Sequence, residues 1–328
     1  MTRARVRRWA AAAVATLLLA TGAYVGSRWD TAADDGRGLG PVVLATGSPN
    51  GVYHQFGQAL AEAAGTAAGP AQALVTAGSV ENLRLLAQGR ATFAFTTMDV
   101  AVAAYAGRAP FPGEVPVRAV ARLYDDYLHL VTPAESPVHA ITDLRGMRVS
   151  VGSDGSGTAL IADRILDGAG LRPEHDIIRA ELSLTEAIEA MHSHRIDAFF
   201  WSGGLPTPGM TALATTTAIR LIDLAAAADT LRAAYGSVYR TKNIPAGTYQ
   251  GMTAAITTIA VPSLLVATDA TSPETVERMT GILFATAPAI TGSIPAVSQV
   301  DPHAAIFTEA IPLHDGARDY YRATKVPA

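Results

Sequence analysis

The stretch "VSVGSDGSGTALIADRIL", residues 149–166, decides the fold class of this chain. A strand-like segment leads into a glycine-rich loop, and an apolar run with helical spacing begins directly after Ser156, Gly157 and Thr158. The start of a helix offers unpaired backbone N–H groups and a partial positive charge. The expected ligand of this loop is therefore an anion, either phosphate or carboxylate. The stretch therefore predicts an α/β unit with an anion-binding loop.

Strand-like and helix-like segments alternate on both sides of this stretch. Crossover helices of the length seen here connect parallel strands, which predicts an α/β fold with two lobes. The expected strands cover residues 41–46, 71–77, 91–97, 117–124, 128–133 and 196–201, and the expected helices cover residues 51–65, 79–89 and 273–290. We expect a cleft between two mainly parallel sheets, with strands that cross between the lobes as a hinge.

The same pattern divides the chain into five parts. A strand-rich segment at 252–268 is expected to return the chain to the first lobe. The predicted parts are a signal peptide or membrane anchor at 1–29, a linker at 30–40, the first part of lobe 1 at 41–135, lobe 2 at 136–245, and the return to lobe 1 with C-terminal helices at 246–328.

The N-terminal segment has the pattern of an export signal. Arg3, Arg5, Arg7 and Arg8 precede an uninterrupted apolar run, and this charge arrangement fits insertion with the basic end inside better than it fits a buried helix. The length of the run fits cleavage as well as retention as an anchor. We therefore expect the rest of the chain to be extracytoplasmic, either anchored or released.

Composition excludes several classes of function. The chain has no cysteine, which rules out disulfides, thiolate zinc sites and cysteine nucleophiles. Only 16% of its residues are charged and the net charge is −4, so we expect no basic surface that could follow a nucleic-acid backbone.

Four loops that follow strands are expected to line the cleft, because ligands bind beyond the carboxyl ends of the strands in such sheets. They read "TGSPNGVYHQ", "TTMDVA", "GSDGSGT" and "FFWSGGLPTPGM". These loops are rich in glycine and small residues and nearly free of titratable groups, and Trp201 offers an aromatic wall.

The order of these motifs resembles a known family. "GSPNGVYHQFGQALA", "AGSVENLRLLAQG", "TTMDVA", "LYDDYLHLV", "DLRGMRVSVGSDGSGTALIADRILDGAGL", "DAFFWSGGLPTPGM" and "IPAGTYQG" follow one another from about Val42 to the C-terminus. This order is similar to that of the TAXI family of TRAP-transporter solute-binding proteins. The resemblance implies a periplasmic-binding-protein fold that closes over a small organic anion, such as glutamate or 2-oxoglutarate, and delivers it to a TRAP-type membrane permease.

A second role for the same fold stays open at this point. The chain could be the ligand-sensing partner of a membrane sensor kinase, which a retained N-terminal anchor would favour. The chain also departs from the family pattern, because Thr97 and Met98 stand where a Gln and a Ser are usual, and His54 stands where a second tyrosine is common. These departures imply an altered pocket, and a histidine could also change its response to pH.

The candidate ligand-binding residues come from both lobes, with the anion on the second lobe. Asp99 is expected to cap the following helix rather than to touch an anion, Tyr53 and Trp201 fit core packing as well as a cleft wall, and Arg122 or Lys242 could add positive charge. The candidates are Gly51, Val52, Tyr53, Thr97, Met98, Ser156, Gly157, Thr158, Trp201 and Gly203.

An enzyme is the main alternative, and the sequence argues against it. The glycine loop is not followed by the lysine of a phosphate-binding P-loop, and neither Ser156 nor Ser202 has the spacing of a hydrolase nucleophile. Asp125 and Asp126 are expected on a solvated lobe surface or crossover. His192 and His194 are interpreted as a solvated helix end, so we predict no metal, no cofactor and no catalysis.

Overall fold

The computed structural model describes residues 41–67 and 69–324. The predicted signal or anchor at 1–29 and the linker at 30–40 lie outside these residues. Within the described residues, no helix has the length and the apolar character that a membrane crossing requires.

A ten-stranded sheet runs through both lobes. Its two ends are parallel and its middle is antiparallel, because two long strands pair with each other and with both ends. The order is β2 (Ala71–Leu74), β1 (Val42–Ala45), β3 (Phe93–Thr97), β10 (Ile256–Thr268), β4 (Val117–Pro133), β7 (Ala198–Gly203), β5 (Arg148–Ser150) and β6 (Ile178–Ala180), with β8 (Ile219–Leu221) on β4 and β9 (Arg240–Ile244) on β10.

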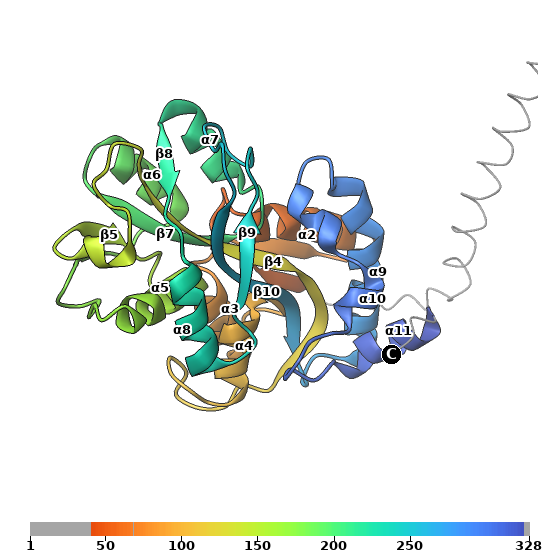
Figure 1. The fold of residues 1–328 in the computed structure, drawn as a ribbon. Helices are drawn as coiled ribbons and strands as arrows, with labels where there is room; N and C mark the ends of the chain where they lie inside the picture. Colours follow the sequence, from red (N-terminus) through yellow and green to blue (C-terminus); the bar gives the residue numbers. More distant parts are fainter. Residues whose placement is uncertain (1–40, 68, 325–328) are drawn as a thin grey trace, which may run out of the picture. The chain divides into compact units, whose positions relative to one another are not determined.

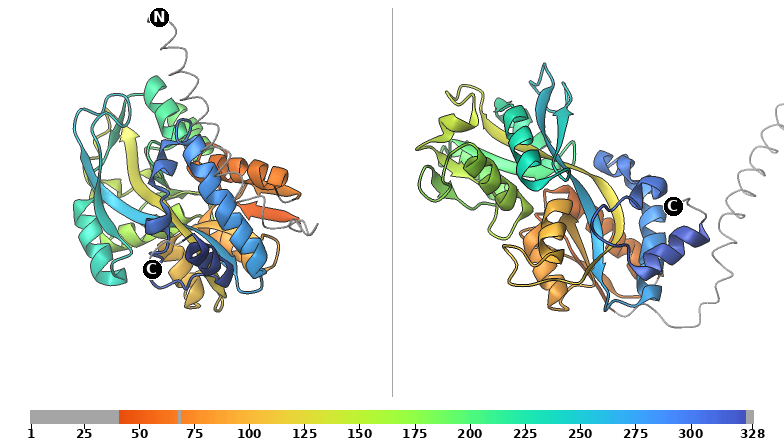
Figure 2. Two further views of the ribbon diagram at one scale, coloured as in Figure 1. Left: turned by 90° about the vertical axis from the view of Figure 1, so that its right-hand side faces the viewer. Right: turned by 60° about the horizontal axis from the view of Figure 1, so that its bottom comes forward.

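Helices accompany each end of the sheet, and this confirms the predicted two-lobed α/β fold (Figure 1). Figure 2 shows the yellow-green and green part of the chain on one side of the crossing strands, and the orange and blue parts on the other. The first lobe holds α2 (Val52–Ala67), α3 (Ser79–Ala87), α4 (Met98–Tyr105), α9 (Pro273–Ile290), η2 (Pro295–Gln299), α10 (Pro302–Ala305) and α11 (Asp315–Ala323), and the second holds η1 (Ile141–Leu144), α5 (Gly157–Gly168), α6 (Leu184–His192), α7 (Pro208–Thr216) and α8 (Ala225–Tyr235).

The strands β4 and β10 belong to both lobes. The last part of β10 pairs with β3 and its first part with β9, while the last part of β4 pairs with β7 and β8. The register of β4 against β10 shifts around Ser263, next to Pro262, which has no N–H group for the ladder. The proposed boundaries at 135/136 and 245/246 fall just after β4 and β9, and we keep them as a proposed division of the chain.

The prediction of separate strands at 117–124 and 128–133 was wrong. Residues 117–133 form one strand, which passes through Asp125 and Asp126 without a break. The two acidic residues interrupt the apolar pattern, but Asp126 accepts from Tyr53 of α2 and Ser263 of β10, and Asp125 accepts from Arg122 of the same strand. A buried polar side chain with partners does not end a strand.

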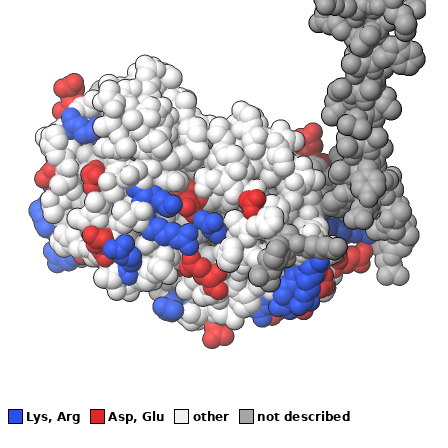
Figure 3. All heavy atoms as spheres, turned by 45° about the vertical axis from the view of Figure 1, so that its right-hand side comes forward, with Lys and Arg blue, Asp and Glu red and all other residues white. Residues whose placement is uncertain are grey.

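Buried apolar side chains form three clusters around the sheet. The largest joins the lobes, since it contains Leu83 of α3 together with Ile165 of α5 and Leu231 of α8. A second cluster packs α2 and α9 on the first lobe, and a third packs α6 and α7 on the second. On the face drawn in Figure 3, Lys and Arg side chains are interspersed with Asp and Glu.

We predict that Gly316→Ala destabilises the protein by about 2 kcal/mol, because overpacking of a tight contact costs about 1–3 kcal/mol. A Cβ atom at Gly316 would lie 1.9 Å from the carbonyl oxygen of Pro273, where α11 meets the start of α9. Denaturant unfolding of the full-length chain measures the effect. Gly65→Ala is the matched control: no atom lies within 4 Å of its Cβ position, and alanine in a helix should add up to about 1 kcal/mol. Equal stability of the two variants would contradict the prediction.

Candidate functional site

A small pocket lies where the N-terminal ends of five helices meet. Its walls include the first residues of α2, α3, α5 and α6 and the residue before α4, and its volume is about 50 Å³. The first N–H groups of a helix have no intrahelical acceptor, and each helix dipole is positive at this end. The pocket is therefore surrounded by donors and positive potential, which favours an anion.

Nine of the ten candidate residues line this pocket, and Met98 is the exception. Its side chain is completely buried in the large hydrophobic cluster, on the core side of α4. Thr97 is in contact with the pocket from the end of β3. The residues that line the pocket as predicted are Gly51, Val52, Tyr53, Thr97, Ser156, Gly157, Thr158, Trp201 and Gly203.

Three hydroxyl groups of the lining are positioned by hydrogen bonds from backbone N–H groups. Ser156 Oγ caps α5 by accepting from the N–H of Ala159 at 2.9 Å, and Thr158 Oγ1 accepts from the N–H of Ser202 at 3.2 Å. Ser79 Oγ accepts from the N–H of Thr97 at 3.1 Å. Each hydroxyl accepts one backbone N–H in this way, and its proton remains available for donation to a ligand.

Two more hydroxyl groups at the pocket have no partner. Ser48 Oγ and Thr97 Oγ1 are buried and make no hydrogen bond within the protein. Buried polar atoms usually have a partner, so an unpartnered pair at a pocket indicates a place for a ligand or water.

The loops of the first lobe are held together by Asn82 of α3. Its amide nitrogen donates to the carbonyl oxygens of Thr46 at 2.6 Å and Phe95 at 2.7 Å, and its amide oxygen accepts from Thr76 Oγ1 at 2.6 Å. These partners lie in or just after three neighbouring strands, and Asn82 is fully buried. One side chain therefore fixes the positions of the strand ends that line the pocket.

Trp201 forms a wall between two glycines. A Cβ atom at Gly203 would lie 2.8 Å from the indole Nε1, which is too close for a side chain, and one at Gly51 would lie 3.3 Å from the ring, which is a tight contact. The indole Nε1 donates to Thr207 Oγ1 at 3.1 Å. The Tyr249 hydroxyl in turn accepts from the N–H of Thr207 at 3.2 Å, so the wall is supported from behind.

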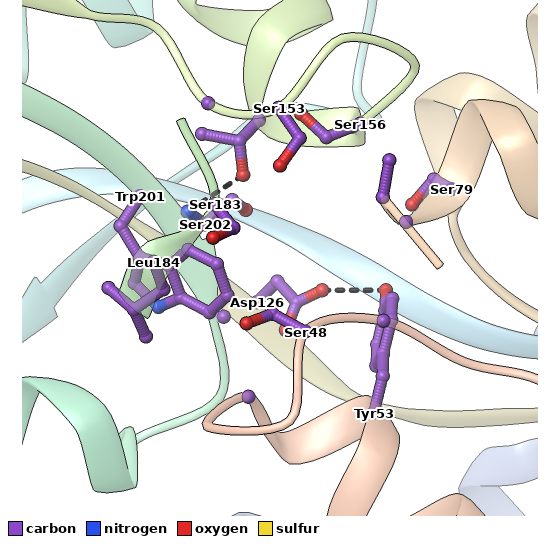
Figure 4. Close-up of a pocket in the computed structure, with 18 of the residues that line it drawn as sticks. Ser48, Tyr53, Ser79, Asp126, Ser153, Ser156, Ser183, Leu184, Trp201 and Ser202 are labelled. Carbon is purple, nitrogen blue, oxygen red and sulfur yellow. Dashed lines mark hydrogen bonds between the residues drawn. The ribbon is translucent and has the colours of Figure 1, made fainter. Parts of the chain in front are cut away.

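The prediction that Asp126 lies on a solvated surface was wrong. Its side chain is 2% exposed and reaches the pocket from β4 (Figure 4). Asp126 Oδ2 accepts from the Tyr53 hydroxyl and from Ser263 Oγ, both at 2.7 Å. Burial raises the pKa of Asp126 to about 7, although the two hydroxyl donors act in the opposite direction. Asp125 is buried too, and it pairs with Arg122 at 2.5 Å.

The prediction that Asp99 caps the helix after it was wrong. Thr97 is the N-cap residue, while the Asp99 carboxylate pairs with Arg164 of α5 at 3.1 Å and accepts from the Tyr239 hydroxyl at 2.7 Å. The ion pair is nearly buried and joins α4 of the first lobe to α5 of the second. Asp99 therefore connects the lobes outside the pocket.

The other charged or titratable candidates also lie away from the pocket. Arg122 is engaged by Asp125, and Lys242 is exposed on β9, so neither supplies positive charge to the lining. His54 is buried against Thr46, with 3.0 Å between Nδ1 and Oγ1, and burial lowers its pKa. His192 is exposed at the end of α6. Among the described residues, no group of three or more His, Cys, Asp or Glu side chains is placed to hold a metal ion.

The two lobes are in direct contact near the pocket. The N–H of Glu81 in α3 donates to the carbonyl oxygen of Gly155 at 2.9 Å, and Asn50 Nδ2 donates to Thr185 Oγ1 at 2.8 Å. A Cβ atom at Gly157 would lie 2.9 Å from Ser79 Oγ, so the start of α5 packs closely on the start of α3. The structure is therefore a closed arrangement of the lobes.

A family model covers most of the chain with this geometry. It matches residues 44–323 and is described as the NMT1-like family. The chain belongs to the NMT1-like family.

Solved structures share the fold of this NMT1-like protein at low sequence identity. A binding protein component of an ABC phosphonate transporter from Pseudomonas aeruginosa is 11% identical, with 79% of this chain and 80% of that chain covered and a TM-score of 0.53. A protein from Bordetella bronchiseptica RB50 is 16% identical, with 87% and 82% covered and a TM-score of 0.53. A structure described as a periplasmic transporter is 14% identical, with 87% and 92% covered and a TM-score of 0.52. These similarities show the periplasmic-binding-protein fold.

Sequence reasoning missed several lining residues of the NMT1-like protein. Ser79 is the first residue of α3, and Ser183 is the N-cap of α6, where the sequence SLTE at 183–186 forms a capping box. The sequence patterns of helix starts could therefore have found both residues. Asp126 carried no comparable signal, because its partners are distant in the sequence. The missed residues include Ser48, Ser79, Asp126, Ser153, Ser183, Leu184 and Ser202.

We predict that Asp126 makes the ligand-free protein less stable as the pH rises from about 4 to about 7. The ordinary pKa of the carboxyl is 3.8 and its folded value is about 7, so the folded state binds more protons than the unfolded state in this window. The contribution of Asp126 to the free energy of unfolding therefore falls across the window, and the whole penalty is present above pH 7.

Asp126→Asn should remove this dependence, since asparagine still accepts from Tyr53 and Ser263 but does not ionise. Denaturant unfolding of both proteins at several pH values measures the difference. Wild-type and variant stabilities that run parallel from pH 4 to pH 8 would contradict the prediction.

Proposed function

We propose that the protein is an extracytoplasmic solute receptor that binds a small organic anion between its lobes and delivers it to a TRAP-type membrane permease. The observation that carries this proposal is the meeting of five helix N-termini around hydroxyl groups that backbone N–H groups hold in place. None of the described lining residues is Lys, Arg or His, so the backbone and the hydroxyls provide the recognition of the anion.

The pocket supports binding rather than turnover. A serine nucleophile needs a general base beside it, but the oxygens of Ser79, Ser156 and Thr158 are engaged by backbone N–H groups. The only carboxylate among the described lining residues, Asp126, receives its hydrogen bonds from Tyr53 and Ser263. We therefore propose a receptor that opens and closes without changing its ligand.

The nature of the ligand and of the permease comes from the family resemblance. The motif order is similar to that of TAXI proteins, which implies an amino acid or dicarboxylate such as glutamate or 2-oxoglutarate. A ligand that contacts both lobes would stabilise the closed arrangement, since α3 and α5 start on opposite lobes and both face the pocket.

A thermal unfolding screen of the full-length chain tests the proposal. The probes are single amino acids, dicarboxylates, alkanesulfonates and alkylphosphonates, and a probe that binds only the folded state raises its stability by mass action. The gain is about 2.7 kcal/mol at a concentration 100 times the dissociation constant. If no organic anion raises the melting temperature, the proposal is wrong. Uptake of the binder by vesicles that carry the permease, with and without the purified chain, tests the delivery.

We predict that Thr158→Val weakens binding of the anion found in the screen by about tenfold to hundredfold. Valine has nearly the same shape as threonine but lacks the hydroxyl donor. A hydrogen bond to a charged group contributes about 1.5–3 kcal/mol. The variant also leaves the N–H of Ser202 without its acceptor, so unfolding curves must accompany the titration calorimetry. Thr158→Ser keeps the hydroxyl and should bind nearly as well as the wild type. Equal affinity of the valine and serine variants would show that the hydroxyl does not hold the anion.

We also predict that the folded part of the chain is found outside the cytoplasm, because the basic and apolar N-terminal segment has the pattern of an export signal. Cell fractionation and N-terminal sequencing of the recovered protein test this, and they separate cleavage from retention of the segment. Recovery of the intact chain from the soluble cytoplasmic fraction would contradict it.

A further inference from the structure

Asp126 lines the pocket and has one carboxylate oxygen without a hydrogen-bond partner. Its Oδ2 accepts from the Tyr53 hydroxyl and from Ser263 Oγ, whereas its Oδ1 is buried and has no hydrogen-bond partner. A buried carboxylate oxygen without a donor is costly, so it needs a partner from the ligand or from water. Asp126 is the only carboxylate among the described residues that line this pocket, and most of the other polar side chains there are hydroxyl groups.

The protein does not place a cation at this carboxylate. The described residues that line the pocket include no Lys, Arg or His. Arg122, on the same strand, pairs with Asp125, and Arg164 pairs with Asp99. A buried carboxylate without a positive partner resists ionisation, and the raised pKa of Asp126 is consistent with this. A positively charged group of the ligand would supply the missing partner.

The donors and the acceptor lie in different parts of the pocket. Figure 4 shows Asp126 beside Tyr53, apart from Ser153 and Ser156 at the start of α5. A ligand that uses both parts needs a negative group at the start of α5 and a donor at Asp126. An α-amino acid carries such a pair of groups on one carbon atom.

We propose that Asp126 binds the ammonium group of the ligand and thereby selects an amino acid over the corresponding acid without an amino group. This inference rests on the proposed function, and it narrows the ligand class to zwitterions. A dicarboxylate that lacks the amino group would leave Asp126 without a cation. Its negative charge would face the ionised Asp126 without the compensating ammonium group, so its binding should improve when Asp126 is protonated.

Matched pairs of probes test this with the full-length wild-type chain. Each pair is an amino acid and the acid that lacks only its α-amino group, for example L-glutamate with glutarate, and L-leucine with 4-methylpentanoate. Titration calorimetry is done at pH 8, above the pKa of Asp126. In a pair of which a member binds, the amino acid should bind at least tenfold more tightly than the acid without the amino group. Equal or tighter binding of the deaminated acid would overturn the inference.

Two variants locate the effect on one carboxylate. Asp126→Asn should weaken binding of the amino acid at least tenfold, while the deaminated acid binds as well as before or better. Asp125→Asn is the matched control, because this neighbouring buried carboxylate does not line the pocket, and it should keep the preference for the amino acid. A preference that persists in a folded Asp126→Asn variant would assign the selection to another group and overturn the inference.

The outcomes separate the two proposals. If organic acids bind but the amino group makes no difference in the wild type, only the inference about Asp126 fails. If neither amino acids nor any other organic anion binds, the proposed function fails and this inference fails with it. The comparison in the wild type decides the matter even if Asp126→Asn does not fold.

Discussion

The antiparallel pairing of β4 with β10 is the constraint on which the rest of the structure depends. Each of these strands runs through both lobes, and together they join the parallel strands of one lobe to those of the other. Asp126 and Ser263 lie on these two strands where their register shifts, and Tyr53 of α2 reaches the same point. The hydrogen bonds of Asp126 thus tie a pocket residue directly to the strands that connect the lobes.

The pocket obtains its positive potential from the backbone rather than from side chains. Helix dipoles act at short range, so the helix starts must approach the ligand closely, and small residues permit this approach. Gly157 faces Ser79 and Thr97 across the pocket, with too little space for a side chain. A site of this kind needs no rearrangement of long flexible side chains, and Asn82 keeps its strand ends in place.

The sequence predicted the fold and most of the pocket for one physical reason. Strands and helices with regular apolar spacing reveal where helices begin after strands, and in this fold those points line the cleft. Ser156, Gly157 and Thr158 were found in this way, and all three line the pocket. Met98 was misplaced because the position after a strand end does not tell which side of the new helix faces the core.

Asp126 could not have been found by the same reasoning. Its partners Tyr53 and Ser263 are 73 and 137 residues away along the chain, so only the folded structure shows which groups donate to the carboxylate inside a strand. Asp99 was misjudged for a related reason, since its partners Arg164 and Tyr239 belong to the other lobe. Local patterns predict caps and strand breaks, whereas long-range hydrogen bonds override them.

The contacts between the lobes have a consequence for how a solute would reach the proposed site. While the N–H of Glu81 is bonded to the carbonyl oxygen of Gly155 and α5 packs on α3, the pocket of about 50 Å³ is lined by residues of both lobes. If the proposed solute enters only when these contacts are broken, the apparent dissociation constant rises as the fraction of such molecules becomes smaller. At high solute concentration the association rate therefore reaches a plateau, whose height is the rate at which the empty lobes separate.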